Sequence, residues 1–241
     1  ADVHITATAK ISLSGIYDKV GRHNIRRLSR EDEFTTYKQA AVKKFSQGQP
    51  QASYGKAIRT VLPDDGIACF GVTQMGFFSW FGFPTYFPRT NIQPGYQGTL
   101  GYAFPTGLGA QVANPDKKVV AVTGDGGFMF NVQEMATAVL HNIPLVTILF
   151  NDNTFGNVKR NQKERYNERY ICSDLLNPDF MKLAESFGMA SFRVDTPEGL
   201  EAALDKAFTE DGPVLIEVEI GEMASLWPYM PLKTVKANLP N

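Results

Sequence analysis

The chain has 241 residues, of which 43% are hydrophobic, 12% aromatic and 20% charged, and its 24 basic and 25 acidic residues give a formal net charge of −1. This composition is typical of a globular protein and excludes a disordered chain, a collagen-like repeat and a disulfide scaffold. The balanced charge argues against nucleic-acid binding, and no apolar run reaches the roughly 18 residues that span a bilayer. With two cysteines and no signal-peptide pattern, we expect a cytoplasmic protein.

Residues 1–48 differ from the rest of the chain. We expect a short strand at Val3 and Ile5, a weakly amphipathic helix that ends near Val20, and a charge-dense linker or exposed helix over 22–33. A stretch this short cannot form its own core. It therefore packs on the main domain, residues 49–241, or is the remnant of a neighbouring domain.

From about residue 49, helices alternate with apolar strands. The pattern predicts helices over 51–62, 101–112, 131–141, 179–187 and 198–208, and strands over 67–70, 119–123, 145–150, 192–194 and 214–218. Residues 75–97, rich in aromatics, glycine and proline, are expected to form a long loop. Continuous apolar strands that alternate with helices indicate a parallel sheet covered on both faces. The predicted fold is α/β, with a doubly wound parallel sheet.

Two of the predicted strands run directly into acidic turns, Gly124-Asp125-Gly126-Gly127 and Asn151-Asp152-Asn153-Thr154. In open α/β sheets, ligands bind at the carboxyl ends of the strands. Glycine backbone and free N–H groups favour a phosphate, which the charge of Asp125 would repel unless a divalent cation lay between them. Oxygen ligands from Asp125 and Asp152 suit Mg²⁺ or Ca²⁺. Each turn alone is an ordinary one, so the hypothesis depends on their combination.

That combination resembles the thiamine diphosphate-dependent enzymes. Their signature is Gly-Asp-Gly followed, after just under thirty residues, by an Asn pair, and here Asp152 follows Asp125 by 27 positions. Residues 131–138 and the segment 98–105 are similar to the acetolactate synthase branch, and the resemblance covers about residues 49–220. It implies the thiamine diphosphate-binding fold, with thiamine diphosphate and Mg²⁺ as cofactors.

The resemblance also implies roles for individual residues. Asp125 and Asp152 would bind Mg²⁺ through their carboxylates, and Thr154 through its backbone carbonyl; Asp152 stands where the family usually has Asn. The Gly98 carbonyl would accept from the cofactor's amino group, and Leu100 would hold the cofactor bent. The implied cofactor-binding residues are Val72, Thr73, Gln74, Gly98, Leu100, Gly124, Asp125, Gly126, Gly127, Asp152, Thr154, Gly156 and Asn157.

In this family, the Glu that activates the cofactor belongs to a separate pyrimidine-binding domain, so no catalytic residue is assigned in this chain. Residues 1–20 resemble the end of the family's middle domain and 21–48 the linker after it. The chain would then be the C-terminal part of a longer enzyme, or a natural split subunit, and would bind diphosphate and metal without turning over alone. The resemblance also implies that the enzyme is a homodimer or homotetramer. Any FAD would bind to the middle domain.

The implied reaction is decarboxylation of a 2-oxo acid followed by carboligation, as in acetolactate synthase. The family's usual Trp is replaced by Asn161, so a benzoylformate or pyruvate decarboxylase-like reaction stays open, as does a non-catalytic phosphate-binding module. The aromatic segment 77–87 would line an interface or a substrate pocket. The basic segment 159–169 would be a solvated helix or a contact for a phosphorylated substrate.

Overall fold

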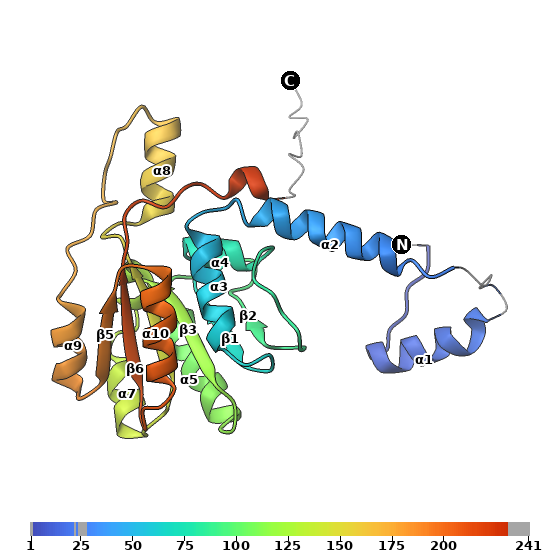
Figure 1. Ribbon diagram of the computed structural model, residues 1–241, viewed down its shortest axis with the longest axis horizontal. Coiled ribbons are helices and arrows are strands. Elements are labelled where there is room, and N and C mark those ends of the chain that lie inside the picture. The colour runs from blue at the N-terminus through green and yellow to red at the C-terminus, as the bar shows by residue number, and fades with distance from the viewer. Residues whose placement is uncertain (1, 22, 24–27, 231–241) are drawn as a thin grey trace. The chain divides into compact units, whose positions relative to one another are not determined.

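Figure 1 shows the computed structural model, which describes residues 2–21, 23 and 28–230. The chain divides into two units, Ala1–Ala41 and Val42–Asn241. Helix α1 (Ala9–Val20) lies in the first unit, α2 (Glu31–Phe45) begins there, and neither helix buries a side chain. The strand expected at Val3 and Ile5 is wrong, because these two exposed residues pair with no described strand. Part of the expected linker over 22–33 lies outside the described residues.

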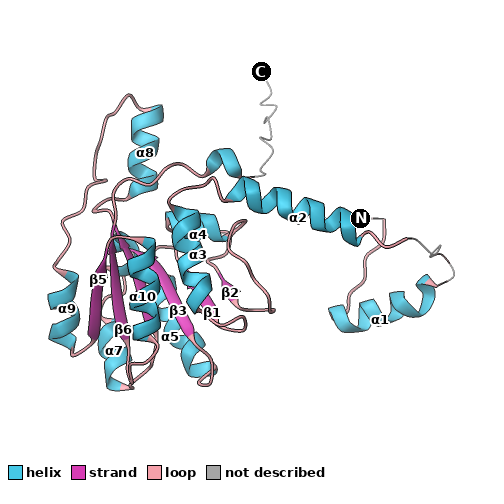
Figure 2. Ribbon diagram, in the orientation of Figure 1, coloured by secondary structure: helices cyan, strands magenta, loops and turns pink. Residues whose placement is uncertain are grey.

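The second unit is built on one parallel sheet (Figure 2). Its strands are β1 (Ile67–Phe70), β2 (Asn91–Ile92), β3 (Val119–Gly124), β4 (Val146–Asn151), β5 (Ala190–Val194) and β6 (Val214–Glu219). They are ordered β2-β1-β3-β4-β6-β5, and every neighbouring pair is parallel. Gly124 pairs with Phe150, so the carboxyl ends of β3 and β4 lie side by side.

Helices cover both faces of the sheet, which confirms the predicted doubly wound α/β fold. One face carries α3 (Gln51–Val61), α4 (Gln74–Ser79) and α10 (Pro197–Ala207), and the other carries α5 (Ala103–Ala113), α7 (Glu134–Leu140) and α9 (Phe180–Phe187). Alternate strand residues point to opposite faces: Val120 and Val122 pack under the first group, Val119 and Ala121 under the second. None of the described helices combines the length and apolarity needed to cross a bilayer.

The expected loop over 75–97 is wrong in part, because it contains α4 and the edge strand β2. Thr73 caps α4 by accepting a hydrogen bond from the Gly76 N–H (2.9 Å), and Met75 and Phe78 are buried on one side of the helix. The glycine and proline content of this segment concealed the capping residue. Part of the aromatic segment is therefore core, whereas Trp80 and Tyr86 are exposed.

The helix predicted over 131–141 begins later, as α7 at Glu134. The Asn131 side chain donates to the Gly101 carbonyl (2.6 Å). A separate single-turn helix, α6 (Asp125–Phe128), follows β3 directly. Helix α8 (Gly156–Arg165) and a 3₁₀ turn (Trp227–Tyr229) complete the described elements.

Two glycines of α5 test how closely this helix packs on the sheet. A Cβ at Gly107 would lie 2.9 Å from the Ala121 Cβ, whereas a Cβ at Gly109 would meet nothing within 4 Å. We expect Gly107→Ala to lower the free energy of unfolding by roughly 1–3 kcal/mol through overpacking. Gly109→Ala should raise it by about 0.5–1 kcal/mol, because alanine is the better helix former. Urea unfolding measures both changes, and equal effects of the two substitutions would contradict this packing.

Candidate functional site

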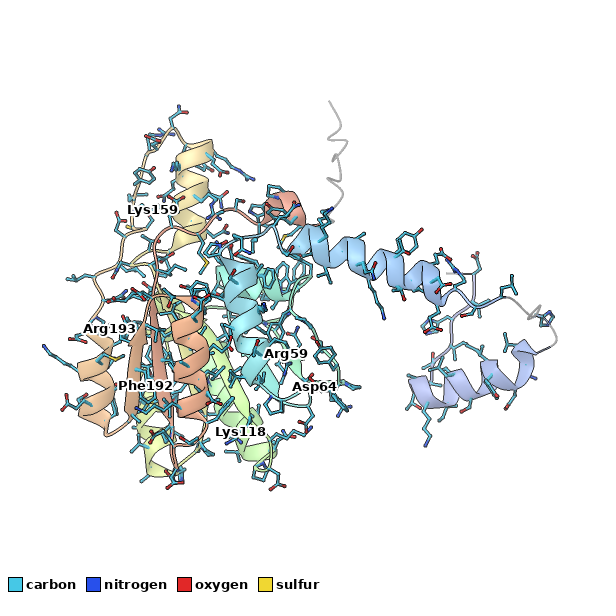
Figure 3. The ribbon with its side chains drawn as sticks, in the orientation of Figure 1. Arg59, Asp64, Lys118, Lys159, Phe192 and Arg193 are labelled. Atoms are coloured by element: carbon cyan, nitrogen blue, oxygen red, sulfur yellow. The ribbon has the colours of Figure 1, made fainter. Side chains whose placement is uncertain are left out.

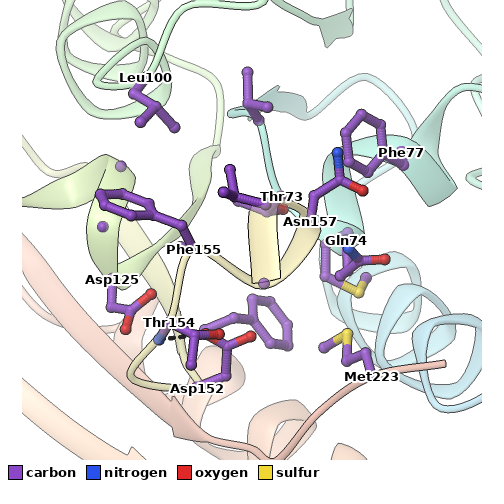
Figure 4. Close-up of a pocket in the computed structure, with 18 of the residues that line it drawn as sticks. Thr73, Gln74, Phe77, Leu100, Asp125, Asp152, Thr154, Phe155, Asn157 and Met223 are labelled. Atoms are coloured by element: carbon purple, nitrogen blue, oxygen red, sulfur yellow. Dashed lines mark hydrogen bonds between the residues drawn. The ribbon is translucent and has the colours of Figure 1, made fainter. Parts of the chain in front are cut away.

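A cavity of about 250 Å³ opens at the carboxyl ends of β1, β3 and β4 (Figure 4). Residues 72–74 follow β1, Gly98 and Leu100 precede α5, residues 124–127 close β3 and open α6, and residues 152–157 join β4 to α8. Every residue of the predicted cofactor-binding set lines this one cavity. The structure thus brings together segments that lie up to 85 positions apart in the sequence, from Val72 to Asn157.

The glycines after β3 allow the two acidic turns to pack closely. A Cβ at Gly126 would lie 2.5 Å from the Phe155 ring, and one at Gly127 would lie 3.3 Å from the Thr123 hydroxyl. A side chain at Gly126 would therefore displace the loop that follows β4. Glycine here also keeps the backbone of α6 accessible from the cavity.

The N-terminus of α8 lies at the cavity wall. Phe155 occupies the N-cap position and no side chain caps the helix. Gly156, Asn157 and Val158 of the first turn line the cavity. Their N–H groups have no partner within the helix, and the helix dipole places partial positive charge here. This end of the cavity therefore favours an anion.

Two carboxylates, Asp125 and Asp152, add negative charge to the cavity wall, in contrast to the positive end of α8. Asp125 is 2% exposed, and its burial raises the pKa of its carboxyl to about 6, although a hydrogen bond from Asn177 opposes the rise. The negative charge of Asp152 adds to this rise, and burial also raises the pKa of Asp152. Neither carboxylate forms an ion pair with a described side chain. Both therefore carry an electrostatic cost when ionised.

Asp152 is held by the residue that follows it by two positions. Its Oδ1 accepts from the Thr154 N–H (3.0 Å) and from the Thr154 hydroxyl (3.1 Å), as the dashed line in Figure 4 indicates for this turn. A Cβ at Gly156 would lie 2.9 Å from Oδ2 of the same carboxylate. The turn therefore fixes the carboxylate of Asp152 at the edge of the cavity.

The acidic turns offer oxygen ligands suited to a hard cation, and the N-terminus of α8 offers N–H donors suited to an anion such as a diphosphate. Among the described residues, no group of three or more His, Cys, Asp and Glu side chains gathers to hold a metal ion. An ion here would rely on two carboxylates, a backbone carbonyl and ligand oxygens, which is the kind of incomplete oxygen set that suits Mg²⁺. A divalent cation would also offset the charge of the two buried carboxylates.

Leu100 faces the acidic turns from the far side of the cavity (Figure 4). It stands between Gly98 and Gly101, which have φ of +57° and +80°. These left-handed conformations favour glycine, and a side chain at Gly101 would collide with the Asn131 amide. The backbone turn thus projects Leu100 into the cavity.

Phe77, from the aromatic segment expected at an interface or a substrate pocket, lines the cavity, whereas the rest of the apolar wall and one buried cation were not expected from the sequence. Phe77, Phe155, Ile220 and Met223 line the cavity, and the last two come from the segment after β6, which carries no motif. Most of the basic segment 159–169 is exposed as expected, but Arg160 is 7% exposed. Its guanidinium donates to the Met223 carbonyl and to Gln74 Oε1 (3.4 Å), beside an adjoining cavity of about 230 Å³.

The chain is similar to acetolactate synthase subunits. It is 42% identical over 157 residues to a probable acetolactate synthase large subunit of Methanococcus aeolicus, covering 65% of this chain and 26% of that protein. It is 39% identical over 145 residues to the acetolactate synthase isozyme 2 large subunit of Escherichia coli K12, covering 60% and 26%. The chain thus spans about a quarter of the length of these curated relatives.

A solved structure shows the same architecture. The thiamine diphosphate-dependent 4-hydroxybenzoylformate decarboxylase of Rhodococcus jostii RHA1 superposes with a TM-score of 0.67 at 29% identity, over 74% of this chain and 34% of that one. Residues 71–218, which include both acidic turns, match the family described as thiamine pyrophosphate enzyme, C-terminal TPP binding domain. The chain therefore belongs to the thiamine pyrophosphate enzymes and carries their C-terminal TPP binding domain.

Proposed function

We propose that this chain is the diphosphate- and Mg²⁺-binding part of an enzyme that acts on 2-oxo acids in the manner of acetolactate synthase. The observation that carries the proposal is the meeting of two acidic turns, at neighbouring strand ends, with glycine backbone and a helix N-terminus around one cavity. The similarity to acetolactate synthase large subunits supports the choice of reaction.

In this proposal, Asp125, Asp152 and the Thr154 carbonyl hold Mg²⁺. The backbone of Gly126, Gly127, Gly156 and Asn157 contacts the diphosphate, as the position of these residues around the cavity allows. The bound cofactor would supply an electron sink for the decarboxylation of a 2-oxo acid.

The remaining lining residues shape the cavity. Leu100, Phe77 and Phe155 form apolar walls that exclude water and orient the cofactor. Gly98 would accept from the cofactor's amino group, and residues 72–74 would contact the diphosphate from the β1 side. We propose that the activating Glu comes from a pyrimidine-binding domain, either of the full-length protein or of a partner subunit in a homo-oligomer. We propose that this homo-oligomer is cytoplasmic. A flavin, if one is needed, would bind to a part of the full-length protein outside this chain.

A decarboxylase reaction is the second candidate, and two observations favour it. A solved relative is a 4-hydroxybenzoylformate decarboxylase. In addition, Asn161 on α8 donates to the Asn157 carbonyl (3.0 Å), so a small polar side chain stands where the acetolactate synthases usually have Trp. The full-length enzyme, incubated with a panel of 2-oxo acids, separates the two candidates. A synthase forms carboligation products, whereas a decarboxylase releases CO₂ and aldehyde only.

Asp125→Ala tests the metal assignment. Thiamine diphosphate with Mg²⁺ should raise the melting temperature of the wild-type chain, since a ligand present at 100 times its Kd adds about 2.7 kcal/mol of stability. We expect the variant to lose this Mg²⁺-dependent rise. Removing a residue that only supports a metal ligand typically lowers metal affinity by roughly 10–100-fold, and removing a direct ligand such as Asp125 should lower it more. ATP and NAD serve as control ligands, and unchanged cofactor affinity by calorimetry would defeat the assignment.

Asp152→Asn should retain cofactor binding. An Asn oxygen can accept both hydrogen bonds from Thr154, and Asn is the family's usual residue at this position. We expect Mg²⁺ affinity within roughly tenfold of wild type, because only one unit of ligand charge is lost. Asp152→Ala is the matched control, and it should bind far more weakly. A severe loss in Asp152→Asn would show that the negative charge itself is required.

A further inference from the structure

A buried carboxylate stands on β6, away from the cavity lining described above. Glu217 is 1% exposed on a strand whose only other charged residue, Glu219, is exposed at its end. Its Oε1 accepts from Asn151 Nδ2 (2.7 Å), and its Oε2 accepts from Arg193 Nε (2.8 Å) on β5. Figure 3 labels Arg193, which lies at the outer edge strand of the sheet. A buried charge on a central strand needs partners of this kind, since its unpaired burial would be costly.

The hydrogen bonds continue from Glu217 to the proposed metal ligand. Asn151 Oδ1 accepts from Asn177 Nδ2 (3.0 Å), and the same nitrogen donates to Asp125 Oδ2 (2.7 Å). It also lies 3.2 Å from Asn153 Oδ1. One amide nitrogen, from the loop before α9, thus meets oxygens from both acidic turns.

The charge of Glu217 determines which side-chain atoms donate and which accept along this chain of hydrogen bonds. An ionised carboxylate can only accept, so the Asn151 side chain must turn its NH₂ toward Glu217 and its oxygen toward Asn177. Asn177 must then present its own NH₂ to that oxygen and to Asp125. Reversing either amide would place two donors or two acceptors against each other. The charge on β6 therefore favours the same amide orientations that give Asp125 a donor.

We propose that Glu217 and Asn177 are positioning residues for Asp125. The Asn177 NH₂ holds Oδ2 of this carboxylate, which leaves Oδ1 to bind a divalent cation as a single, oriented ligand. This inference rests on the proposed Mg²⁺ site. Outer partners of this type orient metal ligands and commonly contribute 10–100-fold to affinity.

The test uses the whole chain and measures the Kd of Mg²⁺ by calorimetry in saturating thiamine diphosphate, below the melting temperature of every variant. Asn177→Leu removes the donor, and Glu217→Gln replaces the acceptor-only group by one that can turn a donor toward Asn151. We expect each to weaken Mg²⁺ binding by roughly 10–100-fold. Thr147→Val on β4 is the matched control, because this fully buried hydroxyl has no hydrogen-bond partner among the described residues. It should leave the affinity unchanged.

The double variant tests whether the residues act as one path. If they do, Asn177→Leu combined with Glu217→Gln weakens binding no more than the stronger single variant does. Losses that multiply would overturn the path, as would unchanged affinity in Asn177→Leu, even if its melting temperature falls. Should Glu217→Gln fail to fold, Asn177→Leu still decides, because its loop lies outside the sheet. A wild-type chain that binds no Mg²⁺ would instead overturn the proposed function, and this inference with it.

Discussion

The burial of two carboxylates at neighbouring strand ends is the constraint on which the site depends. Burial raises the pKa of both Asp125 and Asp152, the charge of Asp152 raises that of Asp125 further, and no described basic side chain forms an ion pair with either, although Lys159 and Arg160 lie near enough to lower the pKa of Asp152. Burial opposes the ionisation of both acids, so this pair does not stabilise the fold. The parallel register of β3 and β4 brings the turns together, and the packed core on both faces of the sheet holds them there. Acidic side chains and a helix N-terminus of opposite partial charge therefore face one cavity.

The parts of the fold that follow from local pattern could be predicted. The strands β1, β3, β4 and β6 are continuous apolar runs that alternate with helices along the chain. This pattern indicates a parallel sheet that is buried on both faces. The acidic turns stand directly after two of these strands, so their meeting followed from the fold class. Helix α4 was not predicted, because its glycine-rich surroundings outweighed one capping residue, Thr73.

Long-range contacts limited the prediction of the site. Met223 and Ile220 reach the cavity from beyond β6, and nothing local distinguishes them. Asn177 contacts Asp125 across 52 positions of sequence. Glu217 alone carried a usable signal, namely one charge at a buried position of an apolar strand. Such a residue reveals that a partner exists, but only the three-dimensional arrangement identifies Arg193 and Asn151.

The cavity and the cores draw mainly on different parts of the fold, and this difference has an evolutionary consequence. Most residues that line the cavity come from loops and helix starts, with Gly124 and Phe150 at the strand ends, whereas most strand residues serve the two cores. Cavity-lining positions that lie outside both cores, such as Leu100 and Val158, can therefore change at less cost to folding, while the acidic turns stay in place. Catalytic diversification then requires no new architecture, in keeping with relatives that bear the names of a synthase and of a decarboxylase on one scaffold.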